Sequence, residues 1–395
     1  MYELMHKNIP VAAFETAESG HMSDVPEVFD EEHLPVGSIC DGAYSEPMLA
    51  TWYLERSIPS ARPGIKQFLS SAGMDSPMDL LSGSMGLSLS DQYWFREQGS
   101  RVDWEDVNFF RNPFSGDVGD MLFGKSRVGE VDLESPDNTT NGVLMKRWTI
   151  CDGERCLLKG GRLPNNQEPV NEAVASTIMK HIGIEHAEYR LMEEDGMLLS
   201  LCGDFVDENT EFVPATHILN LKKRRGDQSL YQHYVEVCSD LGIDVVPSLD
   251  RMLTVDYIML NGDRHFGNFG LIRNADTLEW IGPAPVFDTG TSLQCTKGDS
   301  DMSVDVVPEC KPFMRSFEEQ LKLVSSFDWL DFGSLRDAMP EVREVIGGAS
   351  DYLTDGRATL MADIIGHRID LLEQHALDRV TSRRGWAGCR RTGPS

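Results

Sequence analysis

Residues 260–270 read LNGDRHFGNFG and combine an aspartate, an arginine, a histidine and two asparagines with three glycines. The stretch follows SLDRMLTVDYIML, residues 248–260, whose apolar residues recur three or four positions apart as in a helix. Glycine permits sharp turns, and short polar side chains supply hydrogen-bond donors and acceptors. The pattern therefore predicts a loop that follows a helix and holds something small and charged.

The spacing of three residues in and after this loop suggests what it holds. Asp263 and Asn268 stand five positions apart, and Asp288 follows a predicted hairpin in APVFDTGTSL, residues 284–293. Phosphoryl transfer from ATP needs a carboxylate that orients the attacking hydroxyl and oxygen ligands that hold Mg²⁺. We interpret Asp263 as the catalytic residue, and Asn268 and Asp288 as Mg²⁺ ligands. A plain polar turn is the alternative for the loop alone, but the preceding helix, the hairpin and the later D-x-G favour a phosphotransferase.

Composition narrows the class of protein. The 395 residues suffice for two or three domains. Asp and Glu number 64 against 36 Lys and Arg, a net charge of −28, which would repel a phosphate backbone, so we expect no direct binding of nucleic acid. The eight cysteines contain no C-x-x-C pair, as is typical of reduced thiols. Without a signal-like N-terminus or a long apolar run, we expect a cytoplasmic protein with no membrane association.

The periodicity predicts an α+β protein with a small antiparallel sheet. Asp-Gly pairs at 152–153 and 195–196 predict two hairpins, since this dipeptide is a strong signal for a tight turn. Between them, EPVNEAVASTIMKHIGI, residues 168–184, predicts one helix. The expected domains are an N-terminal accessory region (1–118), the sheet with its helix (119–206), a mainly helical part (207–382) and a disordered tail (383–395).

Three departures from the common protein-kinase pattern point to a particular family. The loop reads Asp-Arg-His instead of His-Arg-Asp, the later motif is Asp-Thr-Gly, and no G-x-G-x-x-G precedes the first hairpin. In these features, and in LLKGG (157–161) and NEAVASTIMKHIGI (171–184), the sequence resembles the HipA-type serine/threonine kinases. This bacterial family is best known for the toxins of toxin–antitoxin pairs, and it shares D-R-H-x-x-N with phosphoinositide 3-kinase-like enzymes. The resemblance covers about residues 130–375.

The resemblance implies a bilobed kinase-like fold with ATP bound between the small sheet and the helical lobe. Lys159 matches the lysine that pairs with the α and β phosphates, and Glu172 matches the glutamate that pairs with this lysine. A solvated edge lysine and a surface glutamate are the alternatives. Arg264 and His265 join Asp263 in the catalytic set in supporting roles, with contacts to the transferring phosphate or to Asp288. A histidine bonded to a nearby backbone carbonyl is the alternative for His265.

The segment ESPDNTTNG, residues 134–142, precedes the first hairpin where a kinase places its phosphate-covering loop. HipA-type kinases often carry a serine there whose autophosphorylation ejects the loop, and Ser135 matches it, with Thr139 and Thr140 as further candidates. A phosphate would add negative charge to a loop that lies over ATP phosphates. A simple Ser-Pro turn is the alternative.

The sequence as a whole therefore predicts an ATP- and Mg²⁺-dependent serine/threonine protein kinase of HipA type. The resemblance implies a protein substrate, for example a translation factor such as an aminoacyl-tRNA synthetase, and a small DNA-binding antitoxin as the route to any DNA. A kinase for lipids or small molecules, and a nucleotide-binding regulatory module without turnover, are the alternatives. The basic run 222–225 could meet an acidic substrate or be solvated.

Overall fold

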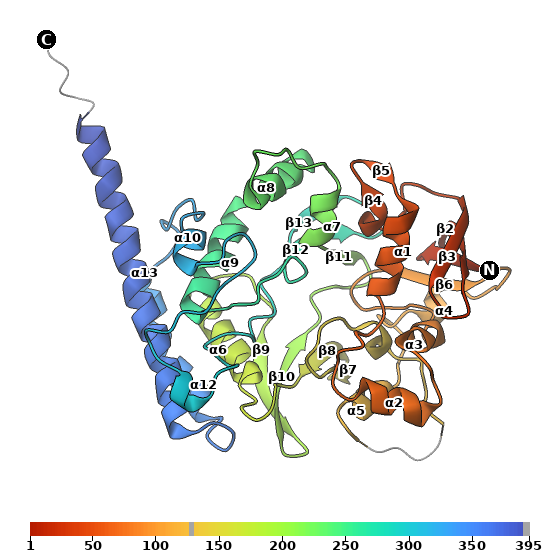
Figure 1. The fold of residues 1–395 in the computed structure, drawn as a ribbon, viewed down its shortest axis with the longest axis horizontal. Helices are drawn as coiled ribbons and strands as arrows, with labels where there is room; N and C mark the ends of the chain where they lie inside the picture. The colour runs from red at the N-terminus through yellow and green to blue at the C-terminus, as the bar shows by residue number, and fades with distance from the viewer. Residues whose placement is uncertain (126–129, 390–395) are drawn as a thin grey trace, which may run out of the picture. The chain divides into compact units, whose positions relative to one another are not determined.

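The structure is a computed structural model that describes residues 1–125 and 130–389 (Figure 1). The chain forms two compact units. The first unit comprises Met1–Gly161, Ala187–Val245 and His265–Pro285. The second comprises Arg162–His186, Val246–Arg264 and Val286–Ser395. Within the described ranges, no helix combines the length and apolar character needed to cross a membrane.

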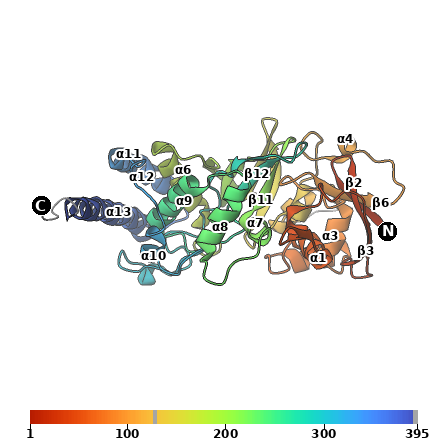
Figure 2. The ribbon, with the colours of Figure 1, turned by 90° about the horizontal axis from the view of Figure 1, so that it is seen from above.

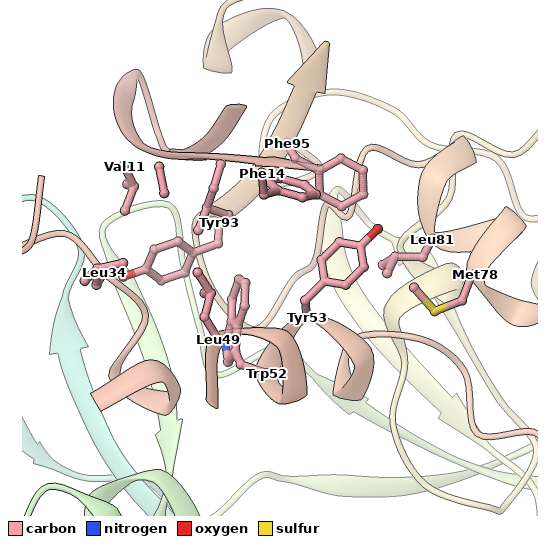
Figure 3. Close-up of a cluster of buried hydrophobic side chains, with 12 residues drawn as sticks. Val11, Phe14, Leu34, Leu49, Trp52, Tyr53, Met78, Leu81, Tyr93 and Phe95 are labelled. Atoms are coloured by element: carbon pink, nitrogen blue, oxygen red, sulfur yellow. The ribbon is translucent and has the colours of Figure 1, made fainter. Parts of the chain in front are cut away.

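The N-terminal part of the first unit is built on an antiparallel sheet with strand order β3-β2-β1-β6. Its strands are β1 (Tyr2–His6), β2 (Ile9–Thr16), β3 (Met22–Val28) and β6 (Tyr93–Glu97). Helix α1 (Glu46–Glu55) covers the sheet, because Trp52 and Tyr53 enter the same buried cluster as Phe14, Tyr93 and Phe95 (Figure 3). The accessory region thus has a hydrophobic core of its own.

Shorter helices and strands complete this region and the segment that follows it. They are η1 (Val36–Ser38), β4 (Ile39–Cys40), β5 (Ala43–Tyr44), α2 (Ile65–Ala72), α3 (Pro77–Gly83), α4 (Trp104–Val107), α5 (Asp117–Leu122) and η2 (Pro136–Thr139). Helices α3 and α5 both contact η2, and α5 also contacts strand β7.

The two predicted hairpins form the second sheet of the first unit, with order β7-β8-β10-β9. Its strands are β7 (Lys146–Cys151), β8 (Glu154–Lys159), β9 (Tyr189–Glu194) and β10 (Met197–Gly203). Asp152 and Gly153 have φ of 54° and 87°, and Asp195 and Gly196 have φ of 51° and 74°. Positive φ at both turn residues is what a two-residue hairpin requires, so both predicted turns are confirmed.

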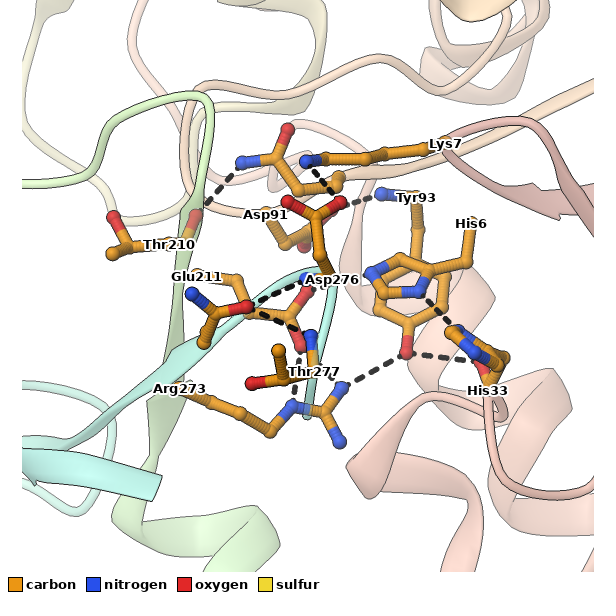
Figure 4. Close-up of polar contacts among 12 residues, drawn as sticks. His6, Lys7, His33, Asp91, Tyr93, Thr210, Glu211, Arg273, Asp276 and Thr277 are labelled. Atoms are coloured by element: carbon orange, nitrogen blue, oxygen red, sulfur yellow. Dashed lines mark hydrogen bonds and ion pairs between the residues drawn. The ribbon is translucent and has the colours of Figure 1, made fainter. Parts of the chain in front are cut away.

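The third sheet of the first unit, β11-β12-β13, is joined to the N-terminal region by a buried polar network (Figure 4). Glu211 lies 3.2 Å from His6 Nε2 and accepts a hydrogen bond from Arg273 Nε at 2.6 Å. Arg273 also donates to the Tyr93 hydroxyl, which donates to the carbonyl of His33. The elements here are β11 (Thr210–Pro214), α7 (Ala215–Asn220), α8 (Leu230–Asp240), β12 (Gly270–Asn274) and β13 (Trp280–Pro283).

The basic run 222–225 finds its counter-charges on α8. Lys222 Nζ lies 2.7 Å from Glu236 and 2.8 Å from Asp240, and Arg225 lies 2.8 Å from Glu236. These carboxylates offset much of the positive charge, which favours the solvated alternative over a site for an acidic substrate.

The second unit is helical. Helix α6 (Glu168–His181) begins at the first residue of the predicted range and ends three residues before its last, with Pro169 in its first turn and Gly183, at φ 66°, just beyond its end. Within this unit α6 contacts α9, α11 and α12 (Figure 2). The other elements are α9 (Val246–Met259), η3 (Asp299–Asp301), α10 (Phe317–Leu321), α11 (Phe332–Asp337), α12 (Met339–Gly347) and α13 (Asp355–Cys389).

Helix α13 contacts α9, α11 and α12. It continues through 383–389, the first part of the range predicted to be a disordered tail. Residues 390–395, the rest of that range, lie outside the described residues.

Candidate active site

The loop that follows α9 is folded back onto the end of that helix. Asn261 donates from its backbone N–H to the Asp256 carbonyl at 3.0 Å and from Nδ2 to Asp256 Oδ1 at 2.8 Å. The N–H of Asp263 donates to Asn261 Oδ1 at 3.2 Å. Two side chains of the second unit therefore hold the backbone of the predicted catalytic residue in one conformation.

Arg264 is the anchor of this loop. Its side chain and that of Asp256 are both 0% exposed, and its Nε and Nη2 donate to the two Asp256 oxygens at 3.0 Å each. Its Nη1 donates to the carbonyl of Phe287, the residue before Asp288. Such a fork bonds several acceptors at once. Arg264 thus joins the loop that carries Asp263 to the D-T-G segment, which is the work of a positioning residue.

The D-T-G segment runs beside the loop within the second unit. The N–H of Gly262 donates to the carbonyl of Thr291 at 3.2 Å, and the N–H of Leu293 donates to that of Met259 at 2.8 Å. Asp288 itself is half-buried and has a φ of 56°, an uncommon conformation for a residue other than glycine. Strained backbone of this kind is concentrated at functional sites.

Helix α6 holds the D-T-G segment from the other side. A Cβ added to Gly290 would lie 3.3 Å from Glu168 Cβ and 3.5 Å from Glu172 Cγ, so a glycine suits this close approach. Asn171 Nδ2 donates to the Gly290 and Ser292 carbonyls at 2.7 and 2.8 Å. Glu172 is 2% exposed, which excludes the surface-glutamate alternative.

Two buried amides, Asn171 of α6 and Gln167 directly before this helix, were not assigned a functional role from the sequence. Asn171 makes the contacts just described, and Gln167 donates to the Leu293 carbonyl at 3.0 Å while accepting from Arg357 Nη1. The available signal was their four-residue spacing at the start of the helix, which puts both amides on one face. Both position the segment that carries Asp288.

Lys159 lies in the first unit and is 4% exposed. Its strand, β8, is bonded to β7 on one side and to β10 on the other, so the alternative of a solvated edge lysine is wrong. The ammonium donates to the Tyr189 hydroxyl at 3.2 Å and lies 5.1 Å from the centre of that ring. A lysine is almost never buried unless it is paired, which makes this one a candidate for a functional role.

His265 and Asn268 belong to the first unit and form a turn. The N–H of Asn268 donates to the His265 carbonyl at 2.9 Å, and the His265 ring accepts at Nδ1 from the N–H of Gly267 at 3.1 Å. His265 is exposed and Asn268 is buried. The histidine therefore makes a local backbone contact, but with an N–H rather than with the carbonyl considered above.

Lys311 is a site residue that the sequence did not indicate. Its Nζ lies 2.7 Å from Asp263 Oδ1, and the two side chains are 56% and 38% exposed. A Cβ added to Gly262 would lie 3.0 Å from the carbonyl oxygen of Glu309, so the segment before Lys311 lies directly against the loop. The partners are 48 positions apart in the sequence, which explains why no local pattern showed the contact.

The three phosphorylation candidates lie in the first unit and are not freely accessible. Ser135 is fully buried and caps η2, because its Oγ accepts from the N–H of Asp137 at 3.3 Å. Thr139 donates to the Leu87 carbonyl at 2.9 Å, and the Thr140 hydroxyl contacts Arg62. Ser135 and Thr140 are buried, so a phosphate could be added to either hydroxyl only after the segment opens.

The donor atoms at the predicted positions fit the chemistry of ATP and Mg²⁺. A carboxylate at Asp288 and an amide oxygen at Asn268 are the hard oxygen ligands that Mg²⁺ prefers. Lys159 supplies a cation suited to phosphate.

Comparison with solved protein structures identifies the fold of this chain. No family model matches the sequence, and no curated protein sequence matches it. The proinflammatory kinase CtkA of Helicobacter pylori is 16% identical over 60% of this chain and 93% of its own, with a TM-score of 0.47. HipA of Shewanella oneidensis MR-1, solved with HipB and operator DNA, is 13% identical over 95% of this chain and 97% of its own, with a TM-score of 0.51. The second likeness confirms the predicted kinase-like α+β architecture: the chain has a HipA-like fold.

Proposed function

We propose that the chain is an ATP- and Mg²⁺-dependent protein kinase of HipA type, which transfers the γ-phosphate to a serine or threonine hydroxyl. One observation carries the proposal: buried Arg264 ties the loop of Asp263 to the residue before Asp288. Phosphoryl transfer depends on positioning and on charge stabilisation more than on covalent chemistry. A rigid connection between a hydroxyl-orienting carboxylate and a metal ligand serves that need.

Each predicted site residue has a role in this proposal. Asp263 orients the attacking hydroxyl and accepts its proton, and His265 supports the transferring phosphate. Asp288 and Asn268 would hold Mg²⁺, which when bound neutralises phosphate charge. Lys159 binds the α and β phosphates.

The remaining site residues have positioning roles in the same proposal. Glu172 faces Gly290 and, with Asn171, supports the backbone that presents Asp288. Arg264 performs the same task from the loop side. Because these side chains act through other residues, their replacement should lower activity without removing a chemical group from the reaction.

We propose cytoplasmic partners of two kinds. The first is a protein substrate, with translation factors such as aminoacyl-tRNA synthetases as the class to examine. The second is a small antitoxin that would carry any DNA binding, since the solved HipA complex contains HipB and operator DNA.

The test is transfer of labelled phosphate from Mg²⁺–ATP by the purified chain to a mixed protein substrate, to lipid vesicles and to water. Labelled serine or threonine in protein is the expected result, and it should require Mg²⁺. Label confined to lipid or a small molecule would establish a different kinase class. ATP binding without any label transfer would establish a regulatory module, and either outcome would overturn the proposal.

A further inference from the structure

Residues 134–145, called here the covering segment, end beside Lys159. The segment leads into β7, whose first residue, Lys146, stands opposite Lys159 in the sheet register. The carbonyl of Met145 accepts from the N–H of Gly160 at 2.9 Å. Any change in the position of this segment therefore alters the surroundings of the proposed phosphate-binding lysine.

Arg62, in the connection between α1 and α2, forms hydrogen bonds to the covering segment. Its Nη2 donates to the Thr140 carbonyl at 2.6 Å and to the Gly142 carbonyl at 2.8 Å. Its Nε donates to the same Gly142 carbonyl at 3.1 Å, and its Nη1 donates to Thr140 Oγ1 at 2.5 Å. The side chain is 2% exposed. Three acceptors on one short stretch are thus held by a single buried guanidinium.

The cation remains charged in this environment. Burial lowers the pKa of Arg62 to about 10, and the neighbouring Asp137 acts in the opposite direction. A guanidinium with this pKa is still protonated at neutral pH. A lysine could not replace it, because its ammonium lacks the planar fork that reaches several acceptors together.

Other parts of the N-terminal region hold the covering segment along its length. Thr139 Oγ1 donates to the Leu87 carbonyl at 2.9 Å, and the N–H of Ser115 donates to the Glu134 carbonyl at 2.8 Å. A Cβ added to Gly119 would lie 2.3 Å from an Asp137 oxygen, so helix α5 approaches the segment as closely as a glycine allows. The segment is therefore fastened to residues between Arg62 and Gly119 rather than to its own hairpin alone.

We infer that Arg62 is a positioning residue through which the N-terminal region holds the covering segment closed beside Lys159. The inference rests on the proposed function, because it gives the accessory region a role in ATP binding. It also sets an order of events: the Arg62 contacts must open before the buried hydroxyls of Ser135 and Thr140 can accept a phosphate. Nucleotide affinity and access to these hydroxyls are then controlled by the same contact.

The direct test is hydrogen exchange of the covering segment in Arg62→Ala, Arg62→Lys and wild-type protein. Loss of the buried charged hydrogen bonds should speed exchange in residues 134–145 by roughly tenfold or more in both variants. Arg101→Ala, which removes an exposed arginine of the same unit, is the matched control and should leave exchange unchanged. Thr140→Val removes only one acceptor, so it should give a smaller increase.

Two exchange results would overturn the inference: no change in the covering segment, or an equal increase over the whole first unit. If Arg62→Ala does not fold, Arg62→Lys and Thr140→Val still decide the question. Exchange needs no catalysis, so this outcome is independent of whether the chain transfers phosphate.

Binding of ATP by the same variants separates positioning from simple stability. Arg62→Lys should raise the Kd for Mg²⁺–ATP several-fold at a temperature where the protein is fully folded, roughly as expected for the loss of one or two charged hydrogen bonds. If wild type transfers phosphate, KM for ATP should rise while kcat changes little. An unchanged Kd in a variant whose covering segment has opened would contradict the link to nucleotide binding.

Discussion

At the scale of single residues, Arg264 connects the two parts of the candidate site, because it bonds both Asp256 and the carbonyl of Phe287. It and Asp256 form a buried ion pair, and Asp256 also accepts a hydrogen bond from Asn261 Nδ2. Removing one member of such a pair leaves a buried charge and typically costs about 3–5 kcal/mol, whereas removing both costs less. Replacing both members of the pair should therefore restore part of the stability without restoring phosphate transfer.

Arg264→Gln alone should lower the free energy of unfolding by roughly 3 kcal/mol or more. The double variant Arg264→Gln with Asp256→Asn should recover part of that loss, yet remain inactive, because the link to the Phe287 carbonyl is gone. Denaturant unfolding and phosphate transfer measured on both variants check this. Equal stability of the single variant and wild type would argue against a buried ion pair here.

Lys311→Met should change the stability of the protein little and yet slow phosphate transfer. Its ion pair with Asp263 is largely exposed, so its loss should change stability by less than about 1 kcal/mol. Transfer should nevertheless slow, because a cation beside the hydroxyl-orienting carboxylate stabilises charge on the transferring phosphoryl group. The measurement is kcat, with Lys322→Met, an exposed lysine of the same unit, as control. A faster rate would show that the ion pair restrains Asp263 instead.

At the scale of helices and strands, short sequence patterns predicted the features that depend on local backbone geometry. The Asp-Gly pairs predicted both hairpin turns, because positive φ at two successive residues nearly demands them. The helix predicted at 168–184 is α6, which begins at Glu168. Sequence could not show that Arg62 reaches Thr140, since that contact spans 78 residues and depends on packing.

The covering segment should open more readily as the pH rises. Burial raises the pKa of Asp137 to about 7, from an ordinary value of 3.8. The folded state therefore keeps a proton that the unfolded state has lost, so this contribution to stability is complete below the ordinary pKa and disappears as pH rises to about 7. Arg62, its charged neighbour, stays protonated throughout this range.

Hydrogen exchange in residues 134–145, corrected for intrinsic rates, should accordingly be slower at about pH 5.5 than at about pH 8. Asp137→Asn should reduce this difference, because the amide cannot ionise. The same pH dependence in the variant as in wild type would assign the effect to another group.

At the scale of the whole molecule, the sequence provided the least information on how the helices and strands group into two compact units. The sequence suggested consecutive domains, and those ranges remain a prediction. The two compact units interleave along the chain, and the boundary between Arg264 and His265 falls inside the D-R-H motif. Periodicity identifies helices and strands, but it does not say which of them group together. The HipA-like fold was predictable because its motifs are short and local.

The net charge of −28 leads to a prediction about partners. The purified chain should not bind operator-like DNA at physiological salt, because phosphate repulsion opposes it. Fluorescence anisotropy with labelled DNA and the purified chain checks this. Nanomolar binding by the chain alone would contradict the expectation.

The central claim is that Asp263 serves the chemical step of phosphoryl transfer. Asp263→Asn keeps the size of the side chain but removes the carboxylate, so Kd for Mg²⁺–ATP should stay within about threefold of wild type while transfer falls at least roughly a hundredfold. Asp351→Asn, at an exposed position in the same unit, should behave as wild type. The decisive measurement is the rate of γ-phosphate transfer to protein by these three proteins at saturating ATP. Loss of transfer in Asp263→Asn alone is the predicted result, and an undiminished rate in that variant would contradict the account.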